Sequence, residues 1–338
     1  MSPTPSSSAS TAPAGYAAAR AGAGVIDRRA RGRIVVSGAD RRSYLQGLFT
    51  NDIAALTPGT GCYACYLTAQ GRMITDLWVF ELGDVLLLTL PAETKDAVLA
   101  KLDQFIFSED VQLGDVSTAF GALAVVGPDA AAAVSAVVTG VSLEALSALG
   151  DGGNIRATFQ GQPAIVLRSV DLGAGGFEVL VDGPQTDALA GALRTAGAEM
   201  VSPEAAEALR IEGGIPRFGT DMDEETIPLE AGIESRAISL TKGCYVGQEV
   251  IIRVLHRGHG KVARKLVGIS LESGAAPGAG ATITVDGRAV GQVTSAALSP
   301  NRGAPLALGY VHRDFVAPGT RVLVADTPGV VTGTNTPP

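Results

Sequence analysis

Strand-like and helical patterns alternate along the first 260 residues without a regular repeat. Two rounds of apolar strand-like runs are present, and each is followed by a run with apolar residues at helical spacing. The first round covers residues 34–36, 62–68, 73–82, 85–90 and 93–105, and the second covers 121–126, 164–168, 176–181 and 186–196. Because the repeated strand–helix units of a doubly wound sheet are missing, the pattern predicts an α+β fold with two related halves.

Two further helices have recognisable start signals. Asp40 stands before a helical run that extends to Leu48, and aspartate is a common N-cap residue. Ser202 is followed by Pro203, which places an N-cap before a proline at the first helical position. Gly213 ends this second helix. We therefore expect short helices directly after both caps.

The character of the chain changes near residue 262. Short strand-like runs, separated by Gly, Pro and Asn turns, occupy residues 263–271, 282–285, 289–295 and 307–311. This pattern is typical of a small all-β barrel or sandwich. The sequence therefore predicts a disordered tail at residues 1–20, an α+β region at 21–250 and a C-terminal β-barrel domain at 262–338.

Composition narrows the function classes. The 338 residues are 46% hydrophobic, and no apolar run reaches the roughly 18 residues that a membrane span needs, so we expect no membrane partner. A formal net charge of -8 argues against direct nucleic-acid binding, although residues 253–265 form a short basic stretch. Only three cysteines are present and the N-terminus lacks a signal peptide, so a reducing, cytoplasmic compartment is expected.

No metal site is expected from the cysteines or histidines. Cys62 and Cys65 form a C-x-x-C pair, but on a strand their side chains point to opposite faces, too far apart for a disulfide or a shared metal. His256 and His259 could share a helix face, but glycines at 258 and 260 make a helix there doubtful and a third ligand is missing. We therefore interpret both pairs as structural.

The third cysteine lies in the most unusual segment of the chain. This segment reads Lys242, Gly243, Cys244, Tyr245, Val246, Gly247, Gln248 and Glu249. The ammonium of Lys242 and the N-terminus of the helical pattern that follows would both favour the thiolate of Cys244, which attacks electrophiles and binds metals. Cys244 is therefore a candidate reactive thiol. The alternative is that it packs as a small apolar residue.

Glu212 is a second candidate, because a carboxylate at the C-terminus of a helix interacts unfavourably with the helix dipole. It therefore needs a partner. The structural alternative is an ion pair with Arg210, Arg217 or Arg236. The functional alternative is a ligand with two adjacent N–H donors, which one carboxylate accepts together.

After about residue 22, the chain resembles the folate-binding family that joins the glycine-cleavage T-protein and the YgfZ-type proteins. The blocks that carry this resemblance are residues 47–52, 71–77, 210–232, 291–295 and 308–311. The octapeptide 242–249 is similar to the K-G-C-Y-x-G-Q-E signature of the YgfZ branch, which T-proteins lack.

This resemblance implies three domains in a ring around a central folate pocket, with tetrahydrofolate or a derivative as cofactor. By similarity, Glu212 accepts the pterin N3–H and 2-amino group, and Arg236 faces the folate. Asp76 falls beside the folate N5 and N10, where the transferase has its catalytic aspartate. Tyr66 either flanks the pterin or packs in the core, since strand alternation places it opposite Tyr63.

Three functions follow from the resemblance. The preferred one is a YgfZ-type factor that supports iron–sulfur cluster assembly and tRNA modification, with iron–sulfur proteins or radical tRNA-modifying enzymes as clients. In that function Cys244 and Lys242 act, and turnover is not required. The second is a tetrahydrofolate-dependent aminomethyltransferase in which Asp76 acts as an acid or base. The third is a folate-binding scaffold without chemistry.

Overall fold

Two mostly antiparallel sheets and one closed barrel contain the strands of the computed structural model, which describes residues 12–256 and 262–333. The first sheet has the order β3 (Gly61–Leu67), β4 (Met73–Glu81), β5 (Leu86–Leu90), β2 (Gly32–Ser37) and β6 (Gln112–Asp115). The second has the order β11 (Glu199–Met200), β1 (Gly24–Asp27), β7 (Phe120–Val126), β10 (Gly176–Asp182), β9 (Gln162–Ser169) and β8 (Asn154–Phe159). Only the short β1–β11 pair is parallel in these sheets.

The barrel closes the C-terminal part of the chain. Its strands follow the order β12 (Arg264–Leu271), β15 (Ala304–His312), β14 (Arg288–Ser299), β13 (Thr282–Val285), β16 (Arg321–Val324) and β17 (Thr327–Gly333). Apolar residues of these strands form a separate core inside the barrel. The predicted α+β fold with a small C-terminal barrel is confirmed.

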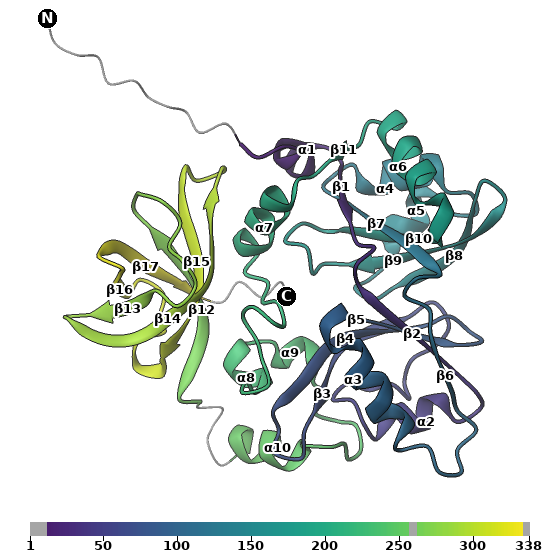
Figure 1. Ribbon diagram of the computed structural model, residues 1–338, viewed down its shortest axis with the longest axis horizontal. Coiled ribbons are helices and arrows are strands. Elements are labelled where there is room, and N and C mark those ends of the chain that lie inside the picture. The colour runs from purple at the N-terminus through teal and green to yellow at the C-terminus, as the bar shows by residue number, and fades with distance from the viewer. Residues whose placement is uncertain (1–11, 257–261, 334–338) are drawn as a thin grey trace, which may run out of the picture.

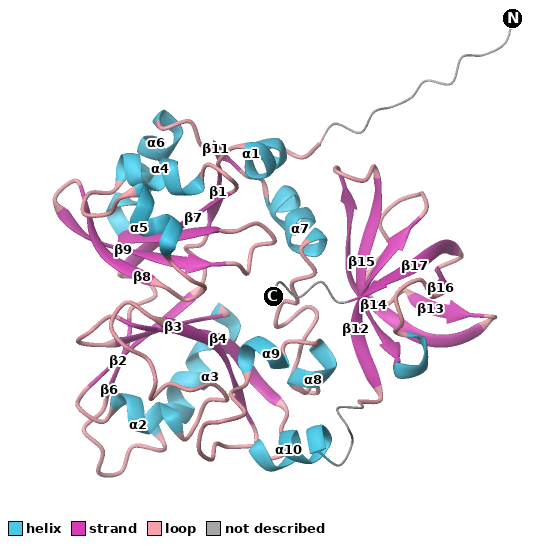
Figure 2. Cartoon of the chain, turned by 180° about the vertical axis from the view of Figure 1, so that it is seen from behind, coloured by secondary structure: helices cyan, strands magenta, loops and turns pink. Residues whose placement is uncertain are grey.

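Helices cover the sheets and connect them to the barrel. The first sheet carries α2 (Arg41–Gln46) and α3 (Ala92–Asp103), and the second carries α4 (Ala130–Val137), α5 (Leu143–Ala148) and α6 (Thr186–Thr195). The connecting helices are α1 (Tyr16–Ala21), α7 (Pro203–Glu212), α8 (Pro228–Ala231), α9 (Glu234–Ala237) and α10 (Gln248–His256). In both Figure 1 and Figure 2, α7, α8 and α9 lie between the barrel and the two sheets.

Most predicted elements are confirmed within one to three residues. Ser202 caps α7 as expected, because its Oγ accepts a hydrogen bond from the N–H of Ala205. Asp40 stands at the N-cap of α2, but its side chain makes no capping hydrogen bond and instead accepts from the N–H of Asp110. The predicted tail was too long, because α1 begins at Tyr16, which is 5% exposed. The helices α4 and α5 and the strands β8, β16 and β17 were not predicted.

Strands β1 and β2 follow each other in the chain but belong to different sheets. The chain enters through β1 in the second sheet and passes through the turn at residues 28–31 into β2 of the first sheet. Arg33, which is fully buried, holds this turn: its guanidinium donates to the carbonyls of Arg28 at 2.8 Å and Arg31 at 3.1 Å. It also lies 3.3 Å from Glu178 on β10. The turn is therefore fixed to both sheets.

A buried carboxylate joins the barrel to α7. Asp221 accepts hydrogen bonds from the guanidinium of Arg210 at 2.6 Å, from Thr294 Oγ1 at 2.5 Å and from Ser295 Oγ at 2.6 Å. Thr294 and Ser295 belong to β14, so one carboxylate connects α7, the segment after it and the barrel. Arg210 is 4% exposed and Asp221 2% exposed, which excludes water from this ion pair. We call these four residues the barrel joint.

Replacement of Asp221 by Ala tests the barrel joint. The change removes the buried carboxylate of the joint and leaves Arg210 paired with the partly exposed Glu207, so we expect the free energy of unfolding to fall by about 3 kcal/mol, the lower end of the range for breaking a buried pair. Denaturant titration followed by circular dichroism measures this loss. Asp314→Ala on the barrel surface is the matched control, because its ion pairs are exposed and we expect a change below about 0.5 kcal/mol. Equal losses in the two variants would contradict the role of the joint.

Candidate functional site

Asp76 lies on the face of the first sheet that is turned toward the second half of the chain. Strand register pairs Asp76 with Cys65 and Trp78 with Tyr63, so these four side chains lie on one face of β3 and β4. The same face packs against Leu167 and other apolar residues of the second sheet and the connecting helices. Alternation along two strands therefore brings a carboxyl group to the junction of the two halves.

The environment of Asp76 favours its protonated form. Burial raises the pKa of the Asp76 carboxyl above its usual range. The Tyr63 hydroxyl, which donates to Asp76 Oδ2 at 2.7 Å, and the positive charge of Arg31 oppose this effect without cancelling it. Asp76 is therefore better suited than an ordinary aspartate to accept and release a proton near neutral pH.

Arg236 covers the aromatic side chains beside Asp76. Its guanidinium lies 5.2 Å from the ring centre of Tyr63 and 5.8 Å from that of Trp78, which are cation–π distances. Asn51 fixes the backbone here, because its side-chain amide donates to the carbonyl oxygens of Tyr63 at 2.8 Å and Arg236 at 2.9 Å. The structure therefore brings together Asp76 and Arg236, two of the predicted site residues.

The second half supplies charged groups to the same junction. Arg28 lies 3.3 Å from Asp171 and 3.5 Å from Glu178, and Arg31 interacts electrostatically with both carboxylates and with Asp76. Burial lowers the pKa of Arg31, and the charge of Arg28 adds to this effect. We call Tyr63, Asp76, Trp78, Arg236, Arg28, Arg31, Asp171 and Glu178 the junction site.

Tyr66 does not belong to the junction site. It points to the opposite face of β3, is 2% exposed and packs edge-to-face against Phe49 at 5.5 Å between ring centres. Of its two expected places, beside a pterin or in the core, the structure shows the core, because side chains an odd number of positions apart point to opposite faces of a strand. The aromatic residues that accompany Asp76 are Tyr63 and Trp78 instead.

Glu212 lies at the C-terminal end of α7, next to the barrel. Its carboxylate accepts hydrogen bonds from Tyr16 Oη at 2.7 Å and from Ser299 Oγ at 2.5 Å. The expected arginine partners were wrong, since no ion pair of Glu212 occurs in residues 12–256 and 262–333. Glu212 lines a cavity of about 210 Å³ together with Arg20 and Arg302. Its role as a pterin acceptor stays a prediction.

Lys242 has a structural role that the sequence did not reveal. Its ammonium donates to the backbone carbonyls of Gln46 and Phe49, both at 2.6 Å, and of Asn51 at 2.9 Å. Burial lowers its pKa to about 8. All three of its hydrogen atoms are directed to carbonyl oxygens, so the ammonium makes no hydrogen bond to Cys244 in the described residues, and its effect on that thiol stays a prediction.

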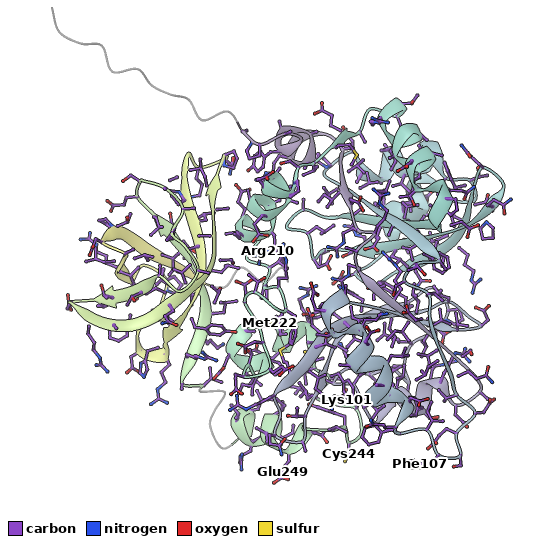
Figure 3. The ribbon with its side chains drawn as sticks, in the orientation of Figure 1. Lys101, Phe107, Arg210, Met222, Cys244 and Glu249 are labelled. Atoms are coloured by element: carbon purple, nitrogen blue, oxygen red, sulfur yellow. The ribbon has the colours of Figure 1, made fainter. Side chains whose placement is uncertain are left out.

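Cys244 is the exposed cysteine of the three. It lies at the edge of the molecule, away from Arg210, and four residues before the start of α10 at Gln248 (Figure 3). The remaining signature residues Gly243, Tyr245, Gly247 and Glu249 lie in the same loop and the first turn of α10. The junction site therefore contains no residue of the octapeptide.

The other cysteine and histidine predictions have mixed outcomes. Cys62 and Cys65 are free and lie on opposite faces of β3, as predicted. Burial raises the pKa of Cys62 to about 12 and that of Cys65 well above its usual range. His259 lies outside the described residues. In the described part of the chain, no group of three His, Cys, Asp or Glu residues could hold a metal ion.

Sequence reasoning missed six of the eight residues of the junction site, and it also missed the supporting residue Asn51. Tyr63 and Trp78 could have been found, because they have the same strand parity as Asp76. Asn51 lies in a block that was recognised, but its contacts with Arg236 are distant in sequence. No local sequence pattern marks Arg31, because its position depends on the turn that carries the chain from the second sheet into the first.

Comparison with known proteins agrees with this fold. The family described as "GCVT N-terminal domain" matches residues 5–242, and the one described as "Glycine cleavage T-protein C-terminal barrel domain" matches residues 264–332. A crystal structure of the glycine cleavage system aminomethyltransferase T from Bartonella henselae has a TM-score of 0.82 and 24% sequence identity, and the alignment covers 94% of this chain and 87% of that chain. This second likeness supports the fold.

Two curated relatives are similar over most of this chain. An aminomethyltransferase from Rubrobacter xylanophilus is 33% identical over 314 residues, which are 93% of this chain and 82% of the relative. A putative chloroplastic transferase from Arabidopsis thaliana is 30% identical over 309 residues, which are 91% of this chain and 69% of the relative.

These relatives correct the preferred function. An iron–sulfur assembly factor with tRNA-modifying clients was expected, but the relatives at about this level of similarity are named aminomethyltransferase. The expectation rested on the octapeptide, and positions 243–249 lie between the two matched ranges. The similarity of the other three hundred or so residues therefore outweighs a signature of eight residues.

None of the described helices is long and apolar enough to cross a membrane.

Lys242→Met tests the structural role of this lysine. The change keeps an unbranched side chain but leaves three carbonyl oxygens without their donor, so we expect the free energy of unfolding to fall by roughly 2–3 kcal/mol. Thermal and denaturant unfolding measure the effect. Lys101→Met on the exposed side of α3 is the control and should change stability little. A Lys242→Met protein as stable as the control would show that the ammonium is dispensable.

Asp76→Asn should stabilise the fold at neutral pH. The folded-state pKa of Asp76 lies above its unfolded value, so its contribution to stability is fully present below the unfolded pKa and is lost as pH rises through the folded pKa. Asparagine carries no charge and can still accept from Tyr63. We therefore expect the stability difference between variant and wild type to increase from pH 4 to pH 8, measured by denaturant unfolding at each pH. A pH-independent difference would contradict the raised pKa.

Proposed function

The chain belongs to the glycine-cleavage T-protein family, and from this premise we propose that it is a folate-dependent transferase that moves a one-carbon unit, with Asp76 as its proton-transfer group. One observation carries the proposal. Asp76 is a half-buried carboxyl group with a raised pKa, and it lies between the hydroxyl of Tyr63 and the positive charge of Arg31. A group in this environment is typical of a catalytic acid or base rather than of a structural ion pair.

Tetrahydrofolate, or a derivative, is the cosubstrate that family membership implies. When it is bound, its N5 and N10 nitrogens supply the chemistry of accepting a one-carbon unit. Two buried groups of the junction site fit such a ligand, since Trp78 Nε1 and Arg31 Nε have no hydrogen-bond partner among the described residues. Buried donors without partners cost free energy, and a ligand with acceptor groups would recover it. The aromatic side chains of Tyr63 and Trp78 also offer contacts to a flat ring system.

Each residue of the junction site has a defined task in this proposal. The aminomethyl group comes from a thioether donor, whose carbon–sulfur bond breaks as a folate nitrogen forms its bond to the carbon and whose sulfur leaves as a thiol. Asp76 accepts a proton that the attacking folate nitrogen loses and gives it to the ammonia that leaves when the carbon–nitrogen bond breaks. Tyr63 orients the carboxyl group through its hydrogen bond at 2.7 Å. Arg236 holds the rings of Tyr63 and Trp78 in place through cation–π contacts. Its main effect on Asp76 is to fix the position of Tyr63. The apolar core beneath the sheet face limits access of water.

We also propose that Glu212 contacts the pterin, but the proposed function does not depend on this contact. Its carboxylate already accepts from Tyr16 and Ser299, but a carboxylate has about four acceptor positions and can bind further donors. The cavity of about 210 Å³ beside it supports this assignment. Glu212 shares no hydrogen bond or ion pair with the junction site in the described part of the chain. The carboxyl group of Asp76 therefore carries the functional proposal without Glu212.

Two finer inferences accompany the family assignment. We infer from the octapeptide 242–249 that the chain lies in the YgfZ branch of this family, and this inference rests on that segment alone. We also infer a cytoplasmic location, supported by three free thiols, which persist in a reducing compartment. Neither inference changes the chemistry proposed for Asp76.

Paired variants of Asp76 and Cys244 test the proposed function. Aminomethyl transfer from a thioether donor to tetrahydrofolate is followed by the appearance of methylenetetrahydrofolate, the free thiol and ammonia. We expect Asp76→Asn to lower the rate by about 100- to 10,000-fold, the usual contribution of an acid–base group, while its fold is retained. Cys244→Ser is the matched control and should keep nearly full activity, because the thiol lies outside the junction site. The reverse order, with Cys244→Ser inactive and Asp76→Asn active, would refute the proposal.

A further inference from the structure

Arg31 is a half-buried cation without a fixed partner among the described residues. Its guanidinium makes no hydrogen bond or ion pair in residues 12–256 and 262–333, and its Nε atom is buried without an acceptor. The side chain is half-buried at the junction of the two halves. An unpaired charge in such a place is costly, and proteins retain it mainly where a ligand supplies the counter-charge.

The carboxylates near Arg31 are already occupied by other groups. Asp171 pairs with Arg28 at 3.3 Å, and Glu178 pairs with Arg28 at 3.5 Å and with Arg33 at 3.3 Å. Asp76 accepts from the Tyr63 hydroxyl. Each of the three carboxylates that interact with Arg31 therefore already has another side chain as its hydrogen-bond or ion-pair partner.

The backbone of Arg31 is held in place before any ligand binds. The carbonyl of Arg31 accepts a hydrogen bond from the fully buried Arg33 at 3.1 Å, and its N–H donates to the carbonyl of Arg28 at 3.2 Å. Both contacts fix the turn between β1 and β2. A rigid turn reduces the entropy cost of ligand binding, so this cation is well placed to act as a preorganised anchor.

We propose that Arg31 binds a carboxylate group of the ligand at the junction site. The planar guanidinium fork matches a carboxylate with two parallel hydrogen bonds, which a single ammonium cannot reproduce. The inference rests on the proposed function, which places a folate at this site. The carboxylate is that of the glutamyl tail of the folate, because the aminomethyl group that the proposed reaction transfers carries no carboxylate.

Binding measurements with matched ligands test this assignment. Isothermal titration compares tetrahydrofolate with tetrahydropteroate, which lacks the glutamyl carboxylates. We expect Arg31→Met to weaken the binding of tetrahydrofolate by about 10- to 100-fold and to leave tetrahydropteroate unchanged. An equal loss for both ligands would show that Arg31 does not act on the carboxylate and would overturn the proposal.

Two further variants guard the interpretation. Arg29→Met is the matched control, because Arg29 belongs to the same turn but pairs with Asp27 at 2.6 Å on the exposed surface, so its loss should leave all affinities unchanged. Arg31→Lys keeps the charge without the fork and should recover part of the lost affinity. Because the guanidinium has no partner, Arg31→Met should remain folded. An unfolded variant would make Arg31 a structural residue and overturn the proposal.

The remaining outcomes are also decisive. If wild type and Arg31→Met bind every ligand alike, the carboxylate assignment is wrong while the proposed function still stands. If wild-type protein does not bind tetrahydrofolate at all, the proposed function fails, and the assignment of Arg31 fails with it. The two failures are therefore distinguishable by the behaviour of the wild-type protein.

Discussion

The buried guanidinium of Arg33 is the contact on which the arrangement of the two halves depends. It is fully buried and is satisfied by the carbonyls of the turn at residues 28–31 and by Glu178 of the second sheet. Since β1 belongs to one sheet and β2 to the other, this turn is where the chain passes between them. Without a donor for those carbonyls, the crossover would contain buried polar groups without partners, which proteins avoid. The crossover in turn brings Arg28 and Arg31 to Asp76.

Buried charges in this protein fall into two groups that differ in how well they are satisfied. Lys242 donates three short hydrogen bonds, Arg210 is paired with Asp221, and Arg33 is held by backbone carbonyls although its Nε has no acceptor, so these groups hold together segments that are distant in sequence. Asp76 and Arg31 have fewer contacts: the first has one donor from a side chain, and the second makes no hydrogen bond or ion pair in the described residues. Incomplete satisfaction costs stability, and proteins tolerate it mainly where function requires it. This difference agrees with a candidate site at Asp76 and Arg31.

Local patterns predicted most of the elements but not the placement of β1 in the second sheet. Alternation of apolar residues gave β3, β4 and β5, and the Ser202–Pro203 pair gave the start of α7, because these signals act within a few residues. The pairing of β1 with β7 joins residues as distant as Gly24 and Val126, and the carbonyl partners of Lys242 lie almost two hundred residues away from it, so no local pattern encodes either contact. For the same reason Asp76 was found by resemblance, whereas Arg31 was found only in the folded chain. The octapeptide was a specific signal, but it lies outside the junction site and led to the wrong function.

The pKa of Asp76 tests the central claim most directly. Carbon-13 NMR of carboxyl-labelled protein, with Asp76→Asn used to assign the resonance, follows this one group through a pH titration. The account predicts that its midpoint lies clearly above the value of about 4 that is usual for aspartate, and that it rises further in Tyr63→Phe, which removes the hydroxyl that favours the ionised form. A midpoint at or below about 4, unchanged in Tyr63→Phe, would contradict the assignment of Asp76 as the proton-transfer group.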